Sequence, residues 1–257
     1  MKKVVSTIRG WIANNGEKIG GVISHGQAIG HSVQKRKLFA NFVGEGKTKV
    51  LFVCAIHGNE VGTAKLGSSL GKFIERQRFP FKCSIIQIAN PDGFSKAIIN
   101  PDYSNGGAIG RLNANNVDLN RNFPVKSFRK NSLWHFGKKK VQVFCGKTGG
   151  SEPEVQAITN FIIKNGITIV FSFHNSGKNV VSSNNPDAKK LAKLFSESSG
   201  YKLLTEEEWI KYGQTGTFKE WCEDNGVIFI EVEGSNRYRS DSRTILPAIA
   251  STLKSLL

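Results

Sequence analysis

The stretch Leu51-Phe52-Val53-Cys54-Ala55-Ile56 runs directly into His57-Gly58-Asn59-Glu60. The apolar run predicts a short buried strand, and a tight turn or a first helical turn after it brings positions 57 and 60 together. Zinc binds imidazole nitrogen and carboxylate oxygen, and a catalytic zinc takes three protein ligands and leaves one position open. The stretch therefore predicts a buried strand that presents His57 and Glu60 as two zinc ligands.

Other apolar runs, rich in Val, Ile and Phe, predict the strands that accompany this one. They lie at residues 84–89, 167–173 and 227–232, and an antiparallel edge hairpin is expected from residues 20–24 and 37–43. Helical patterns fall between the strands, at residues 61–77, 151–164, 187–199, 214–225 and 244–257. This alternation indicates an α/β fold with a mixed, mostly parallel central sheet and helices on both faces.

The length of 257 residues allows one large α/β domain or two small ones. The sequence contains no Pro/Ser-rich linker, no low-complexity tract and no repeat at a fixed period. One domain spanning residues 1–257 is therefore expected. The four cysteines show no paired spacing and predict reduced thiols rather than disulfides: Cys54, Cys83, Cys145 and Cys222.

The formal net charge of +16 comes from lysines and arginines scattered along the whole chain. This distribution favours solvated basic surfaces over a specific nucleic-acid site, and attraction of an acidic small substrate is the second interpretation. No stretch approaches the roughly 20 apolar residues that span a bilayer, so no membrane segment is expected. Met1-Lys2-Lys3 is typical of a signal peptide, but Arg9 interrupts the apolar region, which predicts a cytoplasmic protein without an export signal.

Three further polar blocks follow apolar runs: Asn90-Pro91-Asp92-Gly93-Phe94, Asp118-Leu119-Asn120-Arg121-Asn122-Phe123-Pro124 and Ser172-Phe173-His174. The ligand crevice of an open α/β sheet lies at the carboxyl ends of its strands, so these blocks are expected to converge there. His174 then becomes the third ligand of one zinc ion per chain. Asp118 can hold the second nitrogen of a zinc-bound histidine. Arg121 can grip a carboxylate, with Asn120 donating an amide hydrogen bond.

These blocks stand in the order seen in the zinc carboxypeptidases, which the chain resembles from about residue 29 to about residue 234. Ser151-Glu152-Pro153-Glu154 belongs to the same series. Within that superfamily the chain looks most like the bacterial murein peptide amidases, on the stretches Arg111-Leu112-Asn113-Ala114-Asn115-Asn116-Val117-Asp118 and Gly216-Thr217-Phe218-Lys219-Glu220-Trp221-Cys222. Those enzymes cut the bond between γ-D-glutamate and meso-diaminopimelate in cell-wall peptides.

The resemblance implies a role for each matching residue. His57, Glu60 and His174 bind zinc, and Arg111 polarises the scissile carbonyl and stabilises the oxyanion. Asn120 and Arg121 hold the terminal carboxylate of the substrate, and a glutamate near the end of the last core strand acts as general base. The pocket that reads the leaving residue is expected from loops around residues 125–150, 175–186 and 205–217. His25, His31 and His135 lie in polar or loop-like stretches and are not expected in the site.

The run Ile228-Phe229-Ile230-Glu231-Val232-Glu233-Gly234 offers two glutamates on one face of a strand. Counting onward from Trp221-Cys222 favours Glu233 as the base, whereas the apolar pattern before the glutamate favours Glu231. The family more often carries a threonine-like residue at position 231. A second carboxylate there could raise the pKa of the base or contact an amine of the substrate.

The leading hypothesis is a zinc-dependent peptidase or amidase that releases a C-terminal residue from a small, acidic muropeptide during cell-wall recycling. One alternative is an N-acyl amino acid deacylase of the aspartoacylase or succinylglutamate desuccinylase type, which shares His-Gly-Asn-Glu and Asp-Leu-Asn-Arg. The other is a non-catalytic binding protein on the same scaffold. All the expected ligands, the base and the oxyanion arginine are present, which favours the enzyme.

Overall fold

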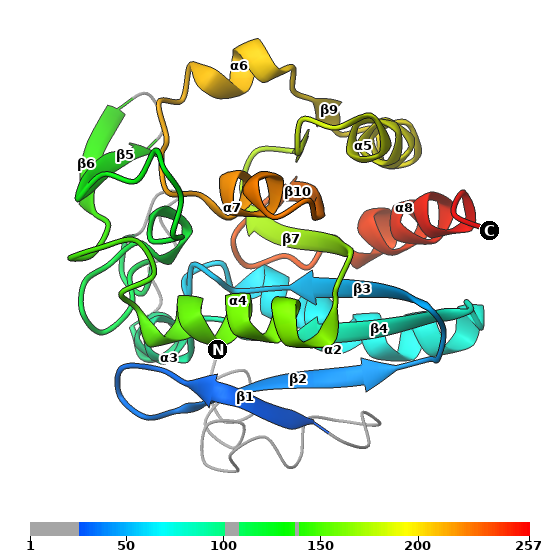
Figure 1. Cartoon of the computed structure of the whole chain (residues 1–257), viewed down its shortest axis with the longest axis horizontal. Helices are drawn as coiled ribbons and strands as arrows, with labels where there is room; N and C mark the ends of the chain where they lie inside the picture. Colours follow the sequence, from blue (N-terminus) through cyan, green and yellow to red (C-terminus); the bar gives the residue numbers. More distant parts are fainter. Residues whose placement is uncertain (1–25, 101–107, 137–138) are drawn as a thin grey trace.

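The computed structural model describes residues 26–100, 108–136 and 139–257. Their central element is an eight-stranded mixed sheet in the order β1 (Gln27–His31), β2 (Lys37–Val43), β4 (Phe81–Ile86), β3 (Thr48–Val53), β7 (Ile169–Asn175), β10 (Ile228–Gly234), β8 (Asn179–Ser182) and β9 (Lys202–Leu203). The four central strands run parallel to one another, and β2 and β8 pair antiparallel to them on either side. The predicted α/β fold is confirmed (Figure 1).

Helices cover both faces of this sheet because its central strands are apolar on both sides. Along β3, Val50 and Phe52 join the core beneath α2 (Val61–Gln77), α5 (Pro186–Ser199) and α8 (Ser242–Lys254). Leu51 and Val53 point to the other face, beneath α4 (Pro153–Asn165) and α7 (Phe218–Asp224). Buried on both faces, the strands hold the loops at their carboxyl ends on a rigid base.

The edge hairpin differs from the prediction in its first strand. Residues 37–43 form β2 as expected, but the strand that pairs with it is β1, and residues 20–24 lie outside the described residues. β1 gives little signal in the sequence because it is mostly solvent-exposed and contains a glycine. A Cβ atom at Gly30 would lie 2.5 Å from the Cβ of Ala157, so glycine lets this edge approach α4 closely.

Several short elements carry no clear signal in the sequence. Helix α3 (Pro91–Ile99) begins where the Asn90 side chain accepts a hydrogen bond from Gly93 N at 2.8 Å. A 3-10 turn, η1 (Leu119–Arg121), a separate hairpin of β5 (Asn131–Phe136) and β6 (Lys139–Phe144), and helix α6 (Glu206–Ile210) complete the description. The helix predicted from residue 214 begins at Phe218, because Thr217 forms its capping box with Glu220.

All four cysteines are buried free thiols, as predicted. Burial raises the pKa of the Cys83 and Cys145 thiols to about 12, which keeps them protonated at neutral pH. In the part of the chain that the structure describes, no helix has the length and apolar character that crossing a bilayer requires.

Candidate active site

The loop after β3 positions His57 and Glu60 inside the protein. Strand pairing continues past β3, because Cys54 N donates to Ile86 O at 2.9 Å and Asn90 N donates to Ala55 O at 3.0 Å. The chain then turns sharply, with Glu60 N donating to His57 O at 3.0 Å, and α2 begins. This turn places His57 Nδ1 2.9 Å from Glu60 Oε1, as the spacing of the two residues predicts.

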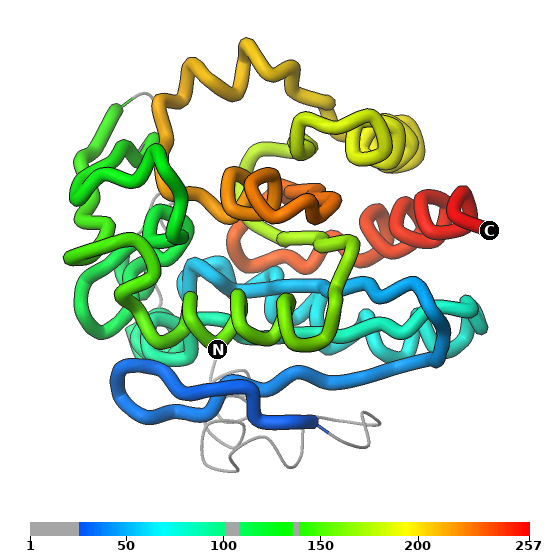
Figure 2. Tube along the Cα trace, in the orientation of Figure 1, coloured from blue at the N-terminus to red at the C-terminus, as the bar shows by residue number. Residues whose placement is uncertain are grey.

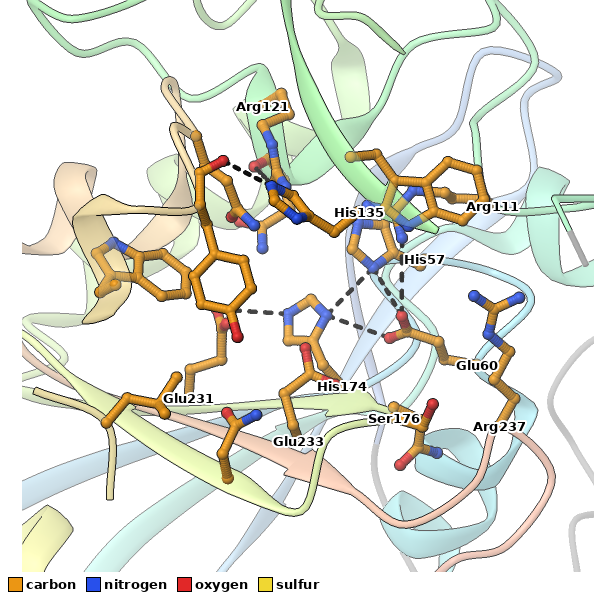
Figure 3. A pocket seen from close by; sticks show the side chains of 18 residues that line it. His57, Glu60, Arg111, Arg121, His135, His174, Ser176, Glu231, Glu233 and Arg237 are labelled. Atoms are coloured by element: carbon orange, nitrogen blue, oxygen red, sulfur yellow. Dashed lines mark hydrogen bonds and ion pairs between the residues drawn. The ribbon is translucent and has the colours of Figure 1, made fainter. Parts of the chain in front are cut away.

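His174 meets this pair from the carboxyl end of β7 (Figure 3). Its Nδ1 lies 3.2 Å from His57 Nδ1 and 3.2 Å from Glu60 Oε2. One ligand atom from each of the three residues lies within 4.8 Å of the others, and all three side chains are buried. Among the described residues, these three form the group of His, Cys, Asp and Glu side chains that could hold a metal ion.

The donor set of this group fits a zinc ion. Two imidazole nitrogens face each other at 3.2 Å, and Glu60 Oε2 beside them lacks a hydrogen-bond partner of good geometry. Such a cluster of buried lone pairs is unfavourable alone and becomes favourable around a cation. Two nitrogens and one carboxylate oxygen are the ligands of a catalytic zinc with one open position.

Asp118 connects the metal group to a buried arginine. Its Oδ1 lies 3.1 Å from His57 Nε2, and its Oδ2 accepts from Arg111 Nε at 3.0 Å and from Arg111 Nη2 at 2.7 Å. Burial alone raises the pKa of Asp118, but the charges of Arg111 and His57 outweigh it and hold this pKa well below its usual range. The anionic Asp118 thereby turns His57 Nδ1 toward Glu60 and fixes the Arg111 guanidinium, which also stacks 4.6 Å from the centre of the Trp134 ring.

Asn120 and Arg121 line the pocket from η1, each held by the backbone around it. Asn120 Oδ1 accepts from Phe218 N at 2.9 Å, so the NH₂ group of the amide stays available. Arg121 donates from Nε and Nη2 to Leu133 O and from Nη1 to Asn120 O. A guanidinium has five N–H groups, so one N–H on each terminal nitrogen remains for a ligand.

The two glutamates of β10 lie at different edges of the His174 ring. In the register of β10 and β7, Glu233 lies beside His174 and Glu231 lies beside Ser172. Glu231 Oε2 is 3.8 Å from His174 Nε2, the nitrogen that points away from Glu60. Burial raises the pKa of Glu233, and the negative charges of Glu60 and Glu231 raise it further.

These groups surround one cavity of about 380 Å³. The three predicted loops all contribute to its lining: 125–150 with Trp134 and His135, 175–186 with Ser176 and Asn179, and 205–217 with Trp209, Tyr212 and Gln214. Figure 2 shows the β5–β6 hairpin beside the chain that follows α6. Hydrogen bonds join them, from Thr215 N to Ser132 Oγ at 3.1 Å and between His135 Nε2 and Tyr212 O at 2.9 Å.

The structure also places two basic residues at the pocket that the sequence does not single out. His135, which was expected outside the site, lines the pocket from the β5–β6 hairpin. No apolar run in the sequence predicts this hairpin. Arg237 follows β10 by three residues and lines the pocket opposite Glu231 in Figure 3. The signal for Arg237 was present, because it follows a strand end as the other polar blocks do.

Known proteins resemble this chain both in sequence and in fold. Murein peptide amidase A of Escherichia coli (strain K12) is 31% identical over 140 residues, which cover 52% of this chain and 54% of that protein. The rat carboxypeptidase N catalytic chain is 31% identical over 187 residues, covering 65% of this chain and 40% of that protein. The chain thus spans about half the length of the curated relatives that it matches, or less.

Solved structures with the same fold cover nearly the whole chain. The murein-tripeptide amidase MpaA of Escherichia coli O157 has a TM-score of 0.70 at 23% identity, covering 94% of this chain and 95% of that one. Bovine thrombin-activatable fibrinolysis inhibitor has a TM-score of 0.74 at 21% identity, covering 98% and 96%. The model of the zinc carboxypeptidase family, peptidase M14, matches residues 21–228. The chain therefore belongs to the zinc carboxypeptidase family of hydrolases.

Proposed function

We propose that this protein is a zinc-dependent amidase that hydrolyses the γ-D-glutamyl–meso-diaminopimelate bond of small murein peptides and releases the C-terminal residue. The observation that carries the proposal is the buried group of His57, Glu60 and His174 at the wall of a cavity of about 380 Å³. The 31% identity to murein peptide amidase A, over 140 residues, supports the choice of this bond. We place residues 1–257 in one catalytic domain.

In this proposal His57, Glu60 and His174 hold one zinc ion, which supplies Lewis acidity and lowers the pKa of the attacking water. Glu233 is the general base. It lies beside His174 in the sheet and is half-buried, with its Oε2 shielded from solvent, and burial raises its pKa, which suits a group that must accept a proton. Glu231, the alternative base, contacts the far edge of the His174 ring and is less well placed.

Arg111 meets the negative charge that develops on the carbonyl oxygen. Two hydrogen bonds to Asp118 Oδ2 fix its orientation before the substrate arrives, which is the condition for electrostatic stabilisation without reorganisation. Its Nη1 lies 4.0 Å from Glu60 Oε1, so its guanidinium reaches the metal group.

Asn120 and Arg121 bind the terminal carboxylate of the leaving residue. Both side chains are held by backbone groups and keep N–H donors for the pocket, which supports a rigid carboxylate clamp. A clamp of this kind restricts hydrolysis to the last residue of a chain and makes the protein an exopeptidase.

The test is mass spectrometry of the zinc-loaded protein with L-Ala-γ-D-Glu-meso-diaminopimelate, an ordinary L-peptide and N-acetylaspartate. Release of diaminopimelate alone supports the amidase. Release from the ordinary peptide or from N-acetylaspartate moves the protein to a carboxypeptidase or a deacylase function, and no release from any of them favours a binding protein. Cytoplasmic wall recycling is part of the proposal, and fractionation of the source cells checks it.

A further inference from the structure

The proposed reaction assigns no task to Glu231, although its carboxylate lies inside the pocket. Its side chain is only 4% exposed and lines the cavity with the metal group. Figure 3 shows it rising from β10 toward the edge of His174 that faces away from Glu60. Glu231 is therefore a buried acid in the substrate pocket rather than a charge at the solvated end of a strand.

Glu231 also has no short ion pair or hydrogen bond to its Oε2 from any described residue. Its ion-pair partner is His174 Nε2, 3.8 Å from Glu231 Oε2. That nitrogen lies closer to Ser172 Oγ, at 3.1 Å. By contrast, the buried Asp118 makes two hydrogen bonds to Arg111. The Glu231 carboxylate is therefore held by a long ion pair, and its Oε2 can accept a hydrogen bond from a cationic group that enters the pocket.

The position of Glu231 relates it to the leaving residue. Glu231 lies two positions before Glu233 in β10, so its side chain begins about 7 Å farther from the carboxyl edge of the sheet. Arg121, which we assign to the terminal carboxylate, is near enough for the Glu231 charge to favour its cationic form. A leaving residue held by Arg121 with its scissile bond at Glu233 therefore directs its side chain toward Glu231.

The part of the pocket wall near α6 suits an aliphatic chain that ends in a cation. The segment around α6 contributes Leu204, Trp209 and Tyr212, and the last two have ring centroids 6.0 Å apart. Apolar and aromatic surfaces pack along methylene groups, and aromatic faces attract an ammonium. A side chain whose only charge is negative gains nothing from these rings and is repelled by Glu231, whereas that of meso-diaminopimelate brings an ammonium group beside its carboxylate.

We propose that Glu231 selects leaving residues whose side chain ends in a primary ammonium group, through an ion pair formed on the floor of the pocket. This inference rests on the proposed function, since it assigns the side-chain specificity of the same site. The family more often carries a threonine-like residue at position 231, and the proposal explains the glutamate found here as a specificity residue. Glu233 remains the general base.

The experiment compares kcat/KM for substrate pairs that differ in the ammonium group alone. The first pair is γ-D-glutamyl-L-lysine and γ-D-glutamyl-L-norleucine, and the second carries meso-diaminopimelate or 2-aminopimelate as leaving residue. The wild type is expected to favour the ammonium member by about 10- to 100-fold, because a charged hydrogen bond in a buried site discriminates on that scale. Glu231→Gln removes most of that preference. It leaves the neutral norleucine substrate nearly unchanged and speeds cleavage of the 2-aminopimelate substrate, whose anionic side chain Glu231 no longer repels.

Two further variants separate specificity from structure. Glu197→Gln removes a carboxylate that is 59% exposed on α5 and should keep the wild-type preference. Glu231→Asp keeps the charge and should retain part of the preference, while zinc content and melting temperature show that each variant is folded. Equal kcat/KM for both members of a pair in the wild type overturns the proposal, as does an equal loss for both in Glu231→Gln.

The experiment also distinguishes a wrong choice of scissile bond from a wrong role for Glu231. If no γ-D-glutamyl peptide is cleaved, the same comparison is made with Gly-Gly-Lys and Gly-Gly-norleucine. If nothing is cleaved, calorimetric binding of free L-lysine and free L-norleucine to the wild type decides. Tighter binding of lysine that Glu231→Gln abolishes supports the selective role of Glu231, and equal binding of the two amino acids contradicts it.

Discussion

Asp118 shows how one buried side chain organises several functional groups. One carboxylate oxygen faces His57 and the other binds Arg111, so the same residue orients a metal ligand and a group that meets substrate charge. Its own backbone neighbourhood is fixed as well, since Oδ1 accepts from Asn120 N at 3.1 Å. The short block from Asp118 to Arg121 therefore positions the proposed oxyanion group and the proposed carboxylate clamp together.

Glu233, the proposed general base, can be tested by a single substitution. Glu233→Gln keeps the shape of the side chain and removes its ability to accept a proton, so kcat should fall by about 10²- to 10⁴-fold. Zinc should stay bound, because the metal group uses His57, Glu60 and His174. Steady-state kinetics and metal analysis by mass spectrometry measure both. Glu231→Gln with a neutral leaving residue is the control, and survival of turnover in Glu233→Gln together with its loss in Glu231→Gln would reverse the assignment.

At the scale of elements, the loop after β3 depends on a close approach to the start of α3. A Cβ atom at Gly58 would lie 2.1 Å from Phe94 N and 2.7 Å from Gly110 O. Both neighbours are backbone atoms and cannot rotate away, so the loop and the helix must separate to admit a side chain. The polar block Asn90–Gly93 thus supports the site by holding the loop that carries His57 and Glu60.

We therefore expect Gly58→Ala to destabilise the protein by about 1–3 kcal/mol or more, the range for overpacking a rigid interior, and to weaken zinc binding. Denaturant unfolding and zinc competition with a chelator measure the two effects. Gly200→Ala is the control without a clash: its left-handed φ of 70° strains an alanine, but no atom lies within 4 Å of the added Cβ. Gly58 does not lie in the left-handed region, so a loss in Gly58→Ala no larger than that in Gly200→Ala would contradict the steric account.

A buried lysine fixes the wall of the pocket that α6 provides. Lys219 on α7 is 2% exposed, and its Nζ lies 3.3 Å from Glu206 Oε1 on α6 and 2.7 Å from Glu223 Oε1. Both carboxylates are partly solvated, whereas the buried ammonium group of Lys219 relies on these two ion pairs to compensate its charge. This ion-pair network ties a short helix, which buries no residue of its own, to the main domain.

Lys219→Met keeps the volume of the side chain and removes the charge. Loss of two charged hydrogen bonds should lower stability by about 1–3 kcal/mol. Because α6 carries Trp209, the pocket wall loosens, and KM should rise several-fold while kcat changes less. Hydrogen exchange of residues 204–214 reports the loosening directly. The exposed pair of Lys193 and Glu197 offers the control, since Lys193→Met should alter neither exchange nor KM.

For the whole molecule, the parts that could be predicted are the buried strands whose sequences are continuous runs of apolar residues. The runs that became β3, β7 and β10 are apolar because both faces of each strand are covered, and the ligands follow them because parallel strands end at one edge. The convergence of His57 and His174 was predictable on this ground alone. The zinc identity was predicted from the donor types of these residues, whereas the roles of Arg111 and Glu233 needed the family resemblance.

The parts that could not be predicted are those that tertiary contacts stabilise. β1 is an exposed edge, α6 depends on Lys219 from another helix, and the β5–β6 hairpin forms a sheet apart from the core. Their sequences carry too little periodicity to reveal them, because their partners lie far away in the chain. For the same reason His135 was not expected at the pocket, which it reaches through contact with Tyr212.

Removal of zinc tests the metal site through the stability of the entire fold. The two large hydrophobic clusters pack without any of the metal ligands, so the protein should stay folded without metal. It must then bury the lone pairs of His57, Glu60 and His174 without a cation. A ligand at 1,000 times its Kd stabilises the native state by about 4 kcal/mol, which in a chain of this size shifts the melting temperature by about 10 °C. Calorimetry after chelation should show that decrease and its recovery with zinc but not with magnesium, which prefers oxygen ligands. His174→Ala should melt at one temperature with and without zinc, and an unchanged melting temperature of the wild type after complete zinc removal would falsify the three-ligand site.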